Sequence, residues 1–349
     1  MKLILGHGPK PTALVLLGEA PGANETLYGR PFVGEAGDEL TRMLTDANID
    51  RKSAYVTNVF KIQPPGNDVN FFFTTRSDPE ACTDLPSRSG KYLRDEFRQQ
   101  YLDLLRELVD VGPTLVLALG ATALWALLGQ SKISSFVGTL HQPTIDRPYH
   151  ILPTYHPAAV LRQWSYRSTV VANFQKAKAF LDTQTQTPRL DRNALSKFRL
   201  EINPTMAKVR QWTKRLVVAP EIAVDIETAQ GQIRTIAFCC EPDRAYCIPF
   251  WEPPAQRYWP DTRSEIEAWN LVREILQSPG RKILHNGAFD LQYLWRGMGI
   301  PTRGDIEDTM LLHHALEPEL PKGLGQLAAT YLNIPEWKTR SSNGDKDED

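Results

Sequence analysis

Short apolar runs alternate with helix-spaced apolar residues through the first half of the chain. The apolar runs predict buried strands at residues 14–17, 54–60, 114–119 and 150–153. Apolar residues at helical spacing predict helices at residues 35–48 and 91–111. A further helix is expected after Gly120 through 128, and another after the segment 154–162, reaching about residue 181. This alternation is typical of a parallel, layered α/β domain. Residues 68–90 have no clear period, so we expect a long surface loop there, of the kind that is often functional or mobile.

The second half predicts another α/β unit after the polar stretch 184–193. Its expected strands lie at residues 222–228, 233–238, 244–249 and 282–286, with the middle two paired. Its expected helices lie at residues 206–216, 263–277, 288–298, 308–315 and 324–331. Residues 339–349 are polar and charged, which predicts disorder. We therefore expect a first domain at 1–183, a linker at 184–199, a second domain at 200–338 and a tail at 339–349.

Composition adds few constraints. The 349 residues are 42% hydrophobic and 23% charged, which is ordinary for a soluble globular protein. The net charge of −1 indicates no overall positive field that would attract nucleic acid, although a neutral protein can still carry a local basic groove. The cysteines have neither metal-ligand spacing nor a disulfide framework, which fits a reducing cytoplasm; they are Cys82, Cys239, Cys240 and Cys247.

Polar and aromatic residues follow the strands of the first half. These residues are Glu19, Phe32, Asn58, Asn67 and His156. An enzyme that extrudes a nucleobase needs a ring to stack on it, an amide to read its edge, and a group that steers water or stabilises charge. Each of these residues alone is more often structural, but their joint appearance favours such a site.

The residue types suggest individual roles. The Asn58 side chain carries both a donor and an acceptor, so it could pair with the edge of a pyrimidine. His156 precedes Pro157 and could donate a hydrogen bond to a departing base. The tip at residues 158–162 is small and apolar and ends in Arg162, so it could wedge into a base stack while the cation meets phosphate.

These motifs together resemble the family 4 uracil-DNA glycosylases over about residues 11–182. The matching segments are Gly18-Glu-Ala-Pro-Gly, Gly29-Arg-Pro-Phe-Val-Gly, Thr57-Asn, Pro64-Pro-Gly-Asn and His156-Pro-Ala-Ala-Val-Leu-Arg. The resemblance implies hydrolysis of the N-glycosidic bond of deoxyuridine. It implies that Glu19 activates or orients water and that His156 stabilises the uracil anion. The predicted base-binding residues are Gly18, Phe32 and Asn58, and the predicted DNA-binding residues are Asn67, Leu161 and Arg162.

One departure concerns cofactors. Members of that family usually hold an iron–sulfur cluster with four cysteines, one pair of them near the N-terminus. Here Cys82 stands alone in its domain, and a cluster needs several thiolates, so we expect none. We expect no cofactor at all for the glycosylase reaction. The long loop after Asn67 is our candidate for the packing role of the cluster.

A second set of residues carries carboxylates. Asp225 and Glu227 lie on one face of a predicted strand, because side chains alternate with period two. Asp290 lies one turn into the helix that follows the strand ending at Asn286. Such oxygen ligands suit Mg²⁺ or Mn²⁺ and phosphodiester cleavage by two metal ions. A surface strand with no metal is the alternative.

This half resembles the 3′–5′ proofreading exonuclease domain of family A DNA polymerases, which has a ribonuclease H-like fold. The resemblance rests on Asp225-Ile-Glu-Thr, His285-Asn-Gly-Ala-Phe-Asp, Asp308-Thr-Met-Leu-Leu and Lys322-Gly-Leu-Gly-Gln-Leu. It matches three of four acidic ligands, and the Tyr-x-x-x-Asp that supplies the fourth is missing. We assign Asp308 a structural role and expect weak or absent exonuclease activity.

The sequence therefore predicts a DNA-processing protein, an uracil-DNA glycosylase fused to an incomplete exonuclease domain, as in certain phage-like polymerases. Its expected partner is uracil-containing DNA. Two alternatives stay open: a non-catalytic DNA-binding or uracil-sensing module, and the front part of a split polymerase that acts with a separate polypeptide. The sequence leaves open whether the base is uracil or a modified relative such as hydroxymethyluracil, and whether single or double strands are preferred.

Overall fold

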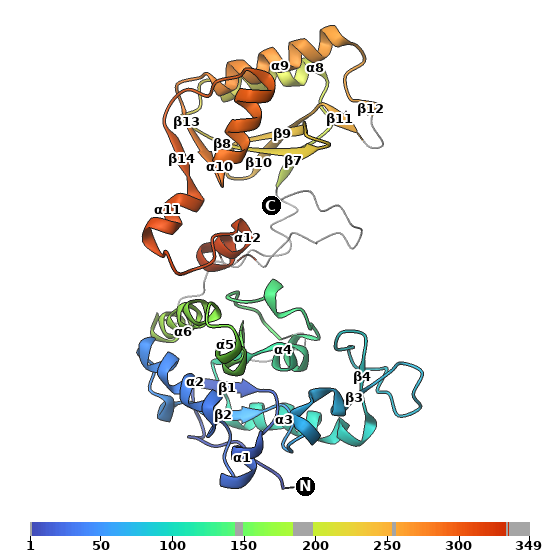
Figure 1. Cartoon of the computed structure of the whole chain (residues 1–349), viewed down its shortest axis with the longest axis vertical. Helices are drawn as coiled ribbons and strands as arrows, with labels where there is room; N and C mark the ends of the chain where they lie inside the picture. Colours follow the sequence, from blue (N-terminus) through green and yellow to red (C-terminus); the bar gives the residue numbers. More distant parts are fainter. Residues whose placement is uncertain (1, 144–148, 184–197, 253–255, 333, 335–349) are drawn as a thin grey trace. The chain divides into compact units, whose positions relative to one another are not determined.

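The protein is described here by a computed structural model, which covers residues 2–143, 149–183, 198–252, 256–332 and 334. The chain forms two compact units (Figure 1). Among the described residues, the first unit holds residues up to 183 together with 319–321 and 325–334, and the second holds 198–318 and 322–324. Of the predicted linker at 184–199, residues 184–197 lie outside the described residues, and Arg199 already begins a strand. The predicted tail at 339–349 also lies outside the described residues.

A four-stranded parallel sheet forms the centre of the first unit. Its strands, in spatial order, are β2 (Tyr55–Asn58), β1 (Leu14–Gly18), β5 (Leu115–Leu119) and β6 (His150–Thr154). All three pairings are parallel, so the predicted layered α/β arrangement is confirmed. The chain leaves β1 toward β2 and returns to β5 on the other side of β1. The carboxyl ends of β1 and β5 therefore form a topological switch point, where open α/β sheets bind ligands.

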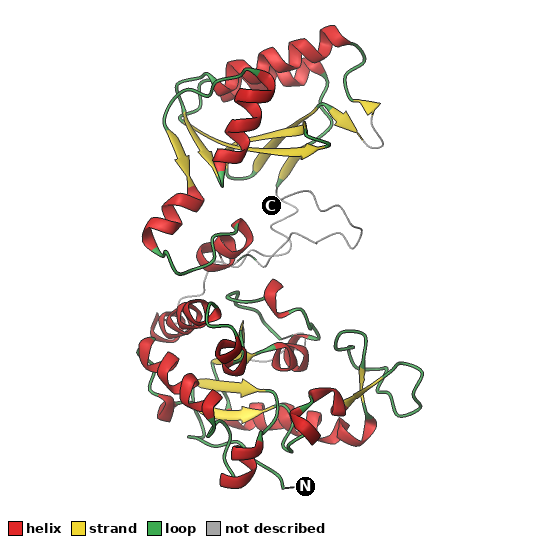
Figure 2. Cartoon of the chain, in the orientation of Figure 1, coloured by secondary structure: helices red, strands yellow, loops and turns green. Residues whose placement is uncertain are grey.

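Helices cover both faces of this sheet (Figure 2). Helices α2 (Glu35–Asp46) and α6 (Tyr166–Thr183) pack in the core that includes Leu14 and Leu16. Helices α3 (Arg98–Val111) and α4 (Ala121–Leu128) pack in the core that includes Val15 and Leu17. Successive residues of a strand point to opposite faces. This explains why β1 is a continuous apolar run with every residue buried.

The segment after β2 differs from the predicted surface loop. It contains the 3₁₀ helices η2 (Pro65–Asn67), η3 (Val69–Phe72) and η4 (Asp95–Phe97), and the strand pair β3 (Phe73–Thr74) and β4 (Tyr92–Leu93). Phe72, Phe73 and Cys82 are buried in the core, so this part of the prediction is wrong. The helix predicted from residue 91 begins only at Arg98. Aromatic residues packed without a period leave no helix or strand pattern to read.

Several short elements complete the first unit. The six-residue helix α1 (Ala23–Tyr28), which the sequence did not predict, follows the turn after β1. The remaining short elements are η1 (Arg51–Ser53), η5 (Ile133–Ser135) and α5 (Pro157–Arg162). Farther along the chain lie α12 (Leu324–Leu327), of which all but Leu324 belongs to this unit, and the π-helix η7 (Ala328–Leu332). Pro157 is the first residue of α5, where its missing N–H costs nothing.

A six-stranded mixed sheet forms the second unit. Its strands, in spatial order, are β14 (Ile306–Asp308), β13 (Arg281–Leu284), β8 (Glu221–Ala229), β9 (Gln232–Glu241), β10 (Arg244–Pro249) and β7 (Arg199–Glu201). The predicted pairing of the second and third strands is the antiparallel β9–β10 pair. A separate small pair joins β11 (Trp251–Glu252) and β12 (Gln256–Arg257).

Helices α8 (Met206–Leu216) and α9 (Thr262–Leu276) lie side by side against this sheet (Figure 2). The other helices are α10 (Gly287–Gln292), the π-helix η6 (Tyr293–Gly297) and α11 (Thr309–Leu316). Across the described part of the chain, no helix combines the length and the apolar character needed to cross a membrane.

Candidate active site

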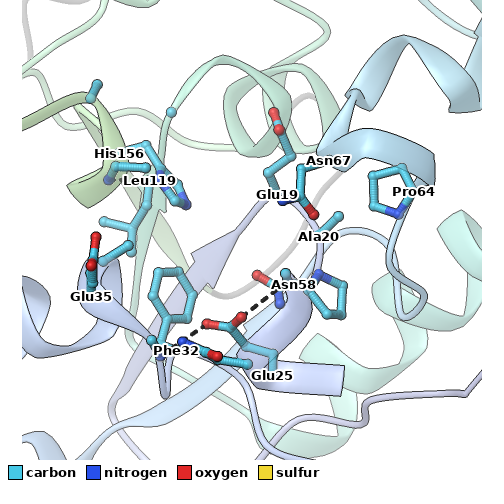
Figure 3. Close-up of a pocket in the computed structure, with 18 of the residues that line it drawn as sticks. Glu19, Ala20, Glu25, Phe32, Glu35, Asn58, Pro64, Asn67, Leu119 and His156 are labelled. Carbon is cyan, nitrogen blue, oxygen red and sulfur yellow. Dashed lines mark hydrogen bonds between the residues drawn. The ribbon is translucent and has the colours of Figure 1, made fainter. Parts of the chain in front are cut away.

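The carboxyl ends of the parallel strands in the first unit surround a cavity of about 630 Å³ (Figure 3). Its lining includes Glu19, Phe32, Asn58, Asn67 and His156, so the structure brings together all five residues singled out at the predicted strand ends. In Figure 3, Glu19 and Asn67 lie across the cavity from His156 and Phe32, and Asn58 lies between them. Parallel strands place their carboxyl ends at one edge of the sheet, which explains this gathering.

Gly18, predicted to bind the base, packs closely against two of these side chains but is not part of the cavity lining. A Cβ at this position would lie 2.3 Å from Asn58 Oδ1 and 2.5 Å from Phe32 Cζ. Both contacts are far shorter than van der Waals distance, so a larger residue would push the amide and the ring apart. The glycine therefore keeps Asn58 and Phe32 close enough to touch the same planar group.

Phe32 is held in an unusual backbone conformation. Its φ is +55°, in the left-handed region that non-glycine residues rarely adopt. Arg51 Nη2 donates a 2.6 Å hydrogen bond to the Phe32 carbonyl, which helps to hold this conformation. The ring is 5% exposed, and its centroid lies 5.6 Å from that of the His156 ring. One face of a flat aromatic slot is thus formed before any ligand enters.

Asn58 is 3% exposed, and its side-chain amide makes no hydrogen bond with another described residue. Its backbone carbonyl accepts a 2.7 Å hydrogen bond from Lys61 Nζ. Lys61 also donates to Glu107 Oε2 at 2.5 Å, and Tyr55 donates to Glu107 Oε1 at 2.7 Å. This buried network fixes the end of β2 and leaves the amide of Asn58 available to a ligand.

His156 is held as a neutral donor. Its Nδ1 accepts a 3.1 Å hydrogen bond from the backbone N–H of Ala158, so the ring proton lies on Nε2. Burial lowers the pKa of the imidazole to about 4; the Arg162 cation adds to this effect and Glu25 opposes it. At neutral pH the ring therefore carries no charge and presents one N–H.

Glu19 follows β1 directly and is fixed from two sides. Its backbone carbonyl accepts a 3.0 Å hydrogen bond from the N–H of Phe60. Its carboxylate oxygen Oε2 accepts a short hydrogen bond from the hydroxyl of Thr122, at the start of α4. The other oxygen, Oε1, makes no hydrogen bond with a described residue. The side chain is 35% exposed, which leaves room for water beside it.

Glu25 is a structural member of the site that the sequence did not single out. Its Oε2 accepts from the N–H of Gly22 at 3.1 Å, and its Oε1 accepts from Val33 and Gly34 at 3.3 and 3.4 Å. These bonds, two of which lie between residues drawn in Figure 3, join the turn after β1 to the loop that carries Phe32. The glycine and glutamate three residues apart resemble a capping box, and that spacing was the signal available in the sequence.

The predicted DNA-binding residues lie around the mouth of the cavity. Asn67 is exposed, lines the cavity and accepts a 3.0 Å hydrogen bond from Gln63 Nε2. Arg162 is exposed and lines the cavity, whereas Leu161 is 43% exposed on the same short helix and is not part of the lining. An apolar side chain beside a cation at the rim suits contact with a nucleic acid that enters the cavity.

The carboxylates of the second unit lie on β8 and α10. Asp225 and Glu227 occupy the exposed face of β8, as the alternation predicted. Asp290 is 4% exposed, and its Oδ1 accepts a 3.0 Å hydrogen bond from the N–H of Ile226. Burial raises the pKa of Asp290 to about 6; the carboxylates of Asp225 and Asp308 add to this effect, while the Ile226 amide opposes it.

These carboxylates do not fit the expected Mg²⁺ or Mn²⁺ site. Within the described residues, no group of three His, Cys, Asp or Glu side chains is arranged to hold a metal ion. The buried Asp290 already accepts from a backbone amide, and we derive no metal-dependent step from it. Asp308 accepts from four backbone amides, those of Asn286, Gly287, Met310 and Leu311, which agrees with the structural role expected for it.

Two family models match the chain. The model of the uracil DNA glycosylase superfamily matches residues 5–182. A 3′–5′ exonuclease model matches residues 201–348. The first match contains the whole cavity, and the second contains the three carboxylates of β8 and α10.

Two curated relatives match the first unit. The type-4 uracil-DNA glycosylase of Thermotoga maritima is 33% identical over 183 residues, which is 51% of this chain and 83% of the relative. The type-4 uracil-DNA glycosylase of Pyrobaculum aerophilum is 34% identical over 177 residues, which is 49% of this chain and 77% of the relative.

Solved structures resemble the chain more weakly. Escherichia coli RNase D, an exoribonuclease, is 19% identical with a TM-score of 0.30, and the match covers 40% of this chain and 34% of that one. The catalytic core of RRP6 from Trypanosoma brucei is 18% identical with a TM-score of 0.33, covering 43% of this chain and 38% of that one. The chain thus spans only about a third of these proteins, and similarity this low supports no functional conclusion.

Proposed function

Because the chain belongs to the uracil DNA glycosylase superfamily and also carries a 3′–5′ exonuclease domain, we propose that its first unit hydrolyses the N-glycosidic bond of deoxyuridine in DNA. The observation that carries this proposal is the cavity that joins an available buried amide, an aromatic slot, a neutral imidazole and a fixed carboxylate. The type-4 glycosylase relatives support uracil as the base.

In this proposal, Phe32 and Asn58 bind the extruded base. The ring of Phe32 stacks on the pyrimidine, and the Asn58 amide donates to one carbonyl and accepts from N3–H. Cytosine presents the opposite pattern at that edge, so a fixed Asn58 amide favours uracil. The network of Lys61 and Glu107 holds the backbone of Asn58, from which the amide reaches the base.

His156 and Glu19 carry the chemistry. The oxygen of water adds to C1′ as the C1′–N1 bond breaks, and the bonding pair stays with uracil N1. The Nε2–H of His156 donates to a carbonyl oxygen of uracil, where the negative charge gathers. Glu19 orients the water through Oε1 and takes the proton that the water loses; the uracil anion is protonated later by solvent.

The rim residues bind the strand that contains the uracil. Leu161 fills the gap that the extruded nucleotide leaves, Arg162 meets a phosphate, and Asn67 contacts the DNA at the mouth of the cavity. Extrusion costs a few kcal/mol, which this wedge and these contacts offset.

The proposal is tested by base release from a labelled DNA strand with one uracil, followed by alkali to cut the abasic site. We expect metal-independent cutting that Glu19→Ala and His156→Ala each reduce by at least about 100-fold. The matched control is Glu80→Ala, an exposed carboxylate that pairs with Arg94 away from the cavity. A parallel strand with hydroxymethyluracil tests the choice of base. Binding without base release would contradict the proposal and support a non-catalytic uracil-sensing module.

For the second unit, we propose weak or absent 3′–5′ exonuclease activity in this chain alone. The exonuclease family match supports the reaction class, and the lack of a three-ligand metal group among the described residues supports the low activity. Action with a separately encoded polymerase polypeptide is the arrangement we propose for full activity. Shortening of a 5′-labelled strand in Mg²⁺ or Mn²⁺, with and without such a polypeptide, tests both statements.

A further inference from the structure

We infer that Arg88 is a positioning residue for Glu19. The segment between β3 and β4 holds Arg88 next to the Glu19 carboxylate. The inference rests on the proposed glycosylase function of the first unit. Arg88 is not part of the cavity lining and matches none of the motifs discussed above. Among the side chains with a proposed catalytic role, Arg88 pairs with Glu19, whose carboxylate is expected to orient water.

The contact involves one oxygen of Glu19. Arg88 Nη2 lies 3.9 Å from Glu19 Oε2, the same oxygen that accepts from the hydroxyl of Thr122. Oε2 thus has one hydrogen-bond donor, the Thr122 hydroxyl, and one nearby cation, the Arg88 guanidinium. Oε1 is the oxygen left to accept a hydrogen bond from water, because no described residue bonds to it. A carboxylate held by one oxygen presents the other in a fixed direction.

Arg88 is a buried cation whose hydrogen bonds are incomplete. Its side chain is 16% exposed, and its Nε is buried without a partner among the described residues. Burial lowers the pKa of the guanidinium, and the carboxylates of Glu19 and Asp68 oppose that effect. A buried charge with an unpaired N–H destabilises a fold. Packing alone therefore gives no reason for an arginine at this place.

The surrounding chain holds Arg88 firmly. The backbone N–H of Arg88 donates to the carbonyl of Lys91 at 2.7 Å, and the return bond is 3.1 Å. Ser89 and Gly90 between them have φ of +51° and +81°, as the two central residues of a tight hairpin turn require. The guanidinium carbon lies 5.3 Å from the centroid of the Phe73 ring.

Two bonds fasten this turn to the rest of the first unit. Trp125 Nε1 donates to the carbonyl of Pro86 at 2.7 Å, and the N–H of Ser89 donates to Ser131 Oγ at 3.2 Å. The guanidinium is therefore in place before substrate binds. Prior positioning matters because a misplacement of about 1 Å in a reacting group can lower a rate by roughly 100-fold.

The test measures single-turnover base release and DNA affinity for the full chain. We expect Arg88→Ala to slow base release by roughly 10- to 100-fold while the Kd for uracil-containing DNA changes by less than about two-fold. Arg88→Lys should recover part of the rate. The matched control is Arg94→Ala, because Arg94 directly follows β4, also has a buried unpaired Nε, and pairs with Glu80 instead of Glu19.

A double-mutant cycle distinguishes positioning from a structural role. In a Glu19→Gln background, adding Arg88→Ala should slow base release no further, because the group that Arg88 positions is already altered. The proposal is overturned if the two effects multiply, if Arg88→Ala weakens DNA binding as much as it slows the rate, or if Arg94→Ala is equally slow.

Failure of the proposed function has a different signature. If the wild-type chain releases no base, the double-mutant cycle is measured by thermal unfolding of the first unit instead. The melting-temperature shift of the Arg88→Ala, Glu19→Ala double variant should then differ from the sum of the two single shifts. Shifts that add would show that the two side chains do not interact, and would overturn the inference whether or not the chain is a glycosylase.

Discussion

Asn58 combines deep burial with an amide that no described residue satisfies. A ligand that fills the cavity and leaves this amide unpaired would lose about 1–3 kcal/mol. A ligand that supplies both a donor and an acceptor removes this cost. The amide of Asn58 therefore selects the pyrimidine edge that presents both of these groups.

Replacing Asn58 tests this argument. Asn58→Ala removes both hydrogen bonds to the base, and losing about 1–3 kcal/mol corresponds to base release that is roughly 5- to 150-fold slower. The measurement is single-turnover release of uracil from labelled DNA. Asn70→Ala, an exposed asparagine that bonds to Asp68, serves as the control and should leave the rate unchanged. A wild-type rate in Asn58→Ala would remove Asn58 from the base-binding site.

His156 makes stability depend on pH. Its pKa is about 4 in the folded chain and about 6.5 when exposed, so the unfolded chain binds more protons between these values. Stability is therefore fully present above pH 6.5 and is lost as the pH falls toward 4. At pH 5.0 the loss amounts to roughly 2 kcal/mol relative to pH 7.5.

His156→Gln should remove this dependence, because glutamine does not titrate. We expect the difference in unfolding free energy between wild type and variant to change by roughly 2 kcal/mol between pH 7.5 and 5.0, in favour of the variant at low pH. Hydrogen exchange of amides in β6 measures it within the first unit. An equal difference at both pH values would mean that the imidazole is not buried in its neutral form.

Strand-end residues could be predicted from the sequence, and their supporting contacts could not. Glu19, Asn58 and His156 each follow a buried apolar run, so a parallel sheet had to gather them. Thr122 and Arg88 meet Glu19 from positions 103 and 69 residues away, across a fold whose loop geometry no periodic pattern encodes. Local patterns carry strands and helices, whereas these contacts depend on how distant loops pack.

At the scale of elements, the segment from η3 to η4 is an aromatic core layer. The rings of Phe60 and Phe72 stack with centroids 3.7 Å apart, and Phe97 packs edge-on against Phe72 at 4.9 Å. The sequence predicted a surface loop because this segment has no period. Its buried rings support the hypothesis that it takes the packing role of an iron–sulfur cluster, and the absence of a cluster stays a prediction.

Phe72→Ala tests how far the first unit depends on this layer. The side chain is fully buried, and truncating a buried phenylalanine costs about 3–5 kcal/mol. Hydrogen exchange of the amides in β1 and β5 should report this loss, since those strands lie in the centre of the first unit. Val109→Ala, which removes a 60% exposed side chain from α3, should change protection by less than about 0.5 kcal/mol. Equal effects of the two substitutions would show that the segment is not part of the core.

At the scale of the whole molecule, the chain holds two α/β units with unequal sites. The two units and their strand–helix order were predictable, because each has its own alternating pattern. In the first, four parallel strands bring the predicted residues to one cavity. In the second, the predicted carboxylates lie on β8 and α10 but form no three-ligand group among the residues described. A sequence motif identifies candidate metal ligands, but it does not show whether their side chains meet at one point in the fold.

Because the two units carry different sites, we expect their two activities to be separable within one chain. Base release needs no metal in the proposed mechanism, so EDTA should leave its rate unchanged within about two-fold, and Asp225→Asn with Asp290→Asn should do the same. Glu19→Gln should slow base release strongly, to a rate that stays measurable, and leave any metal-dependent 3′ shortening intact. Both products can be followed on one 5′-labelled strand, since alkali cuts at the abasic site and the exonuclease produces a ladder from the other end.

The ladder of shortened products from the 3′ end shows whether the second unit is active. The described carboxylates form no three-ligand group, so we expect shortening in Mn²⁺ to be slow or absent. Any remaining exonuclease activity should disappear in the Asp225→Asn, Asp290→Asn variant. Rapid shortening that this variant abolishes would mean that Asp225, Glu227 and Asp290 move together when metal and DNA bind. Rapid shortening that the variant leaves intact would place the cutting site elsewhere. In both cases base release by the first unit should continue at its own rate, because its carboxylate, imidazole and amide are all contributed by the first sheet and its loops.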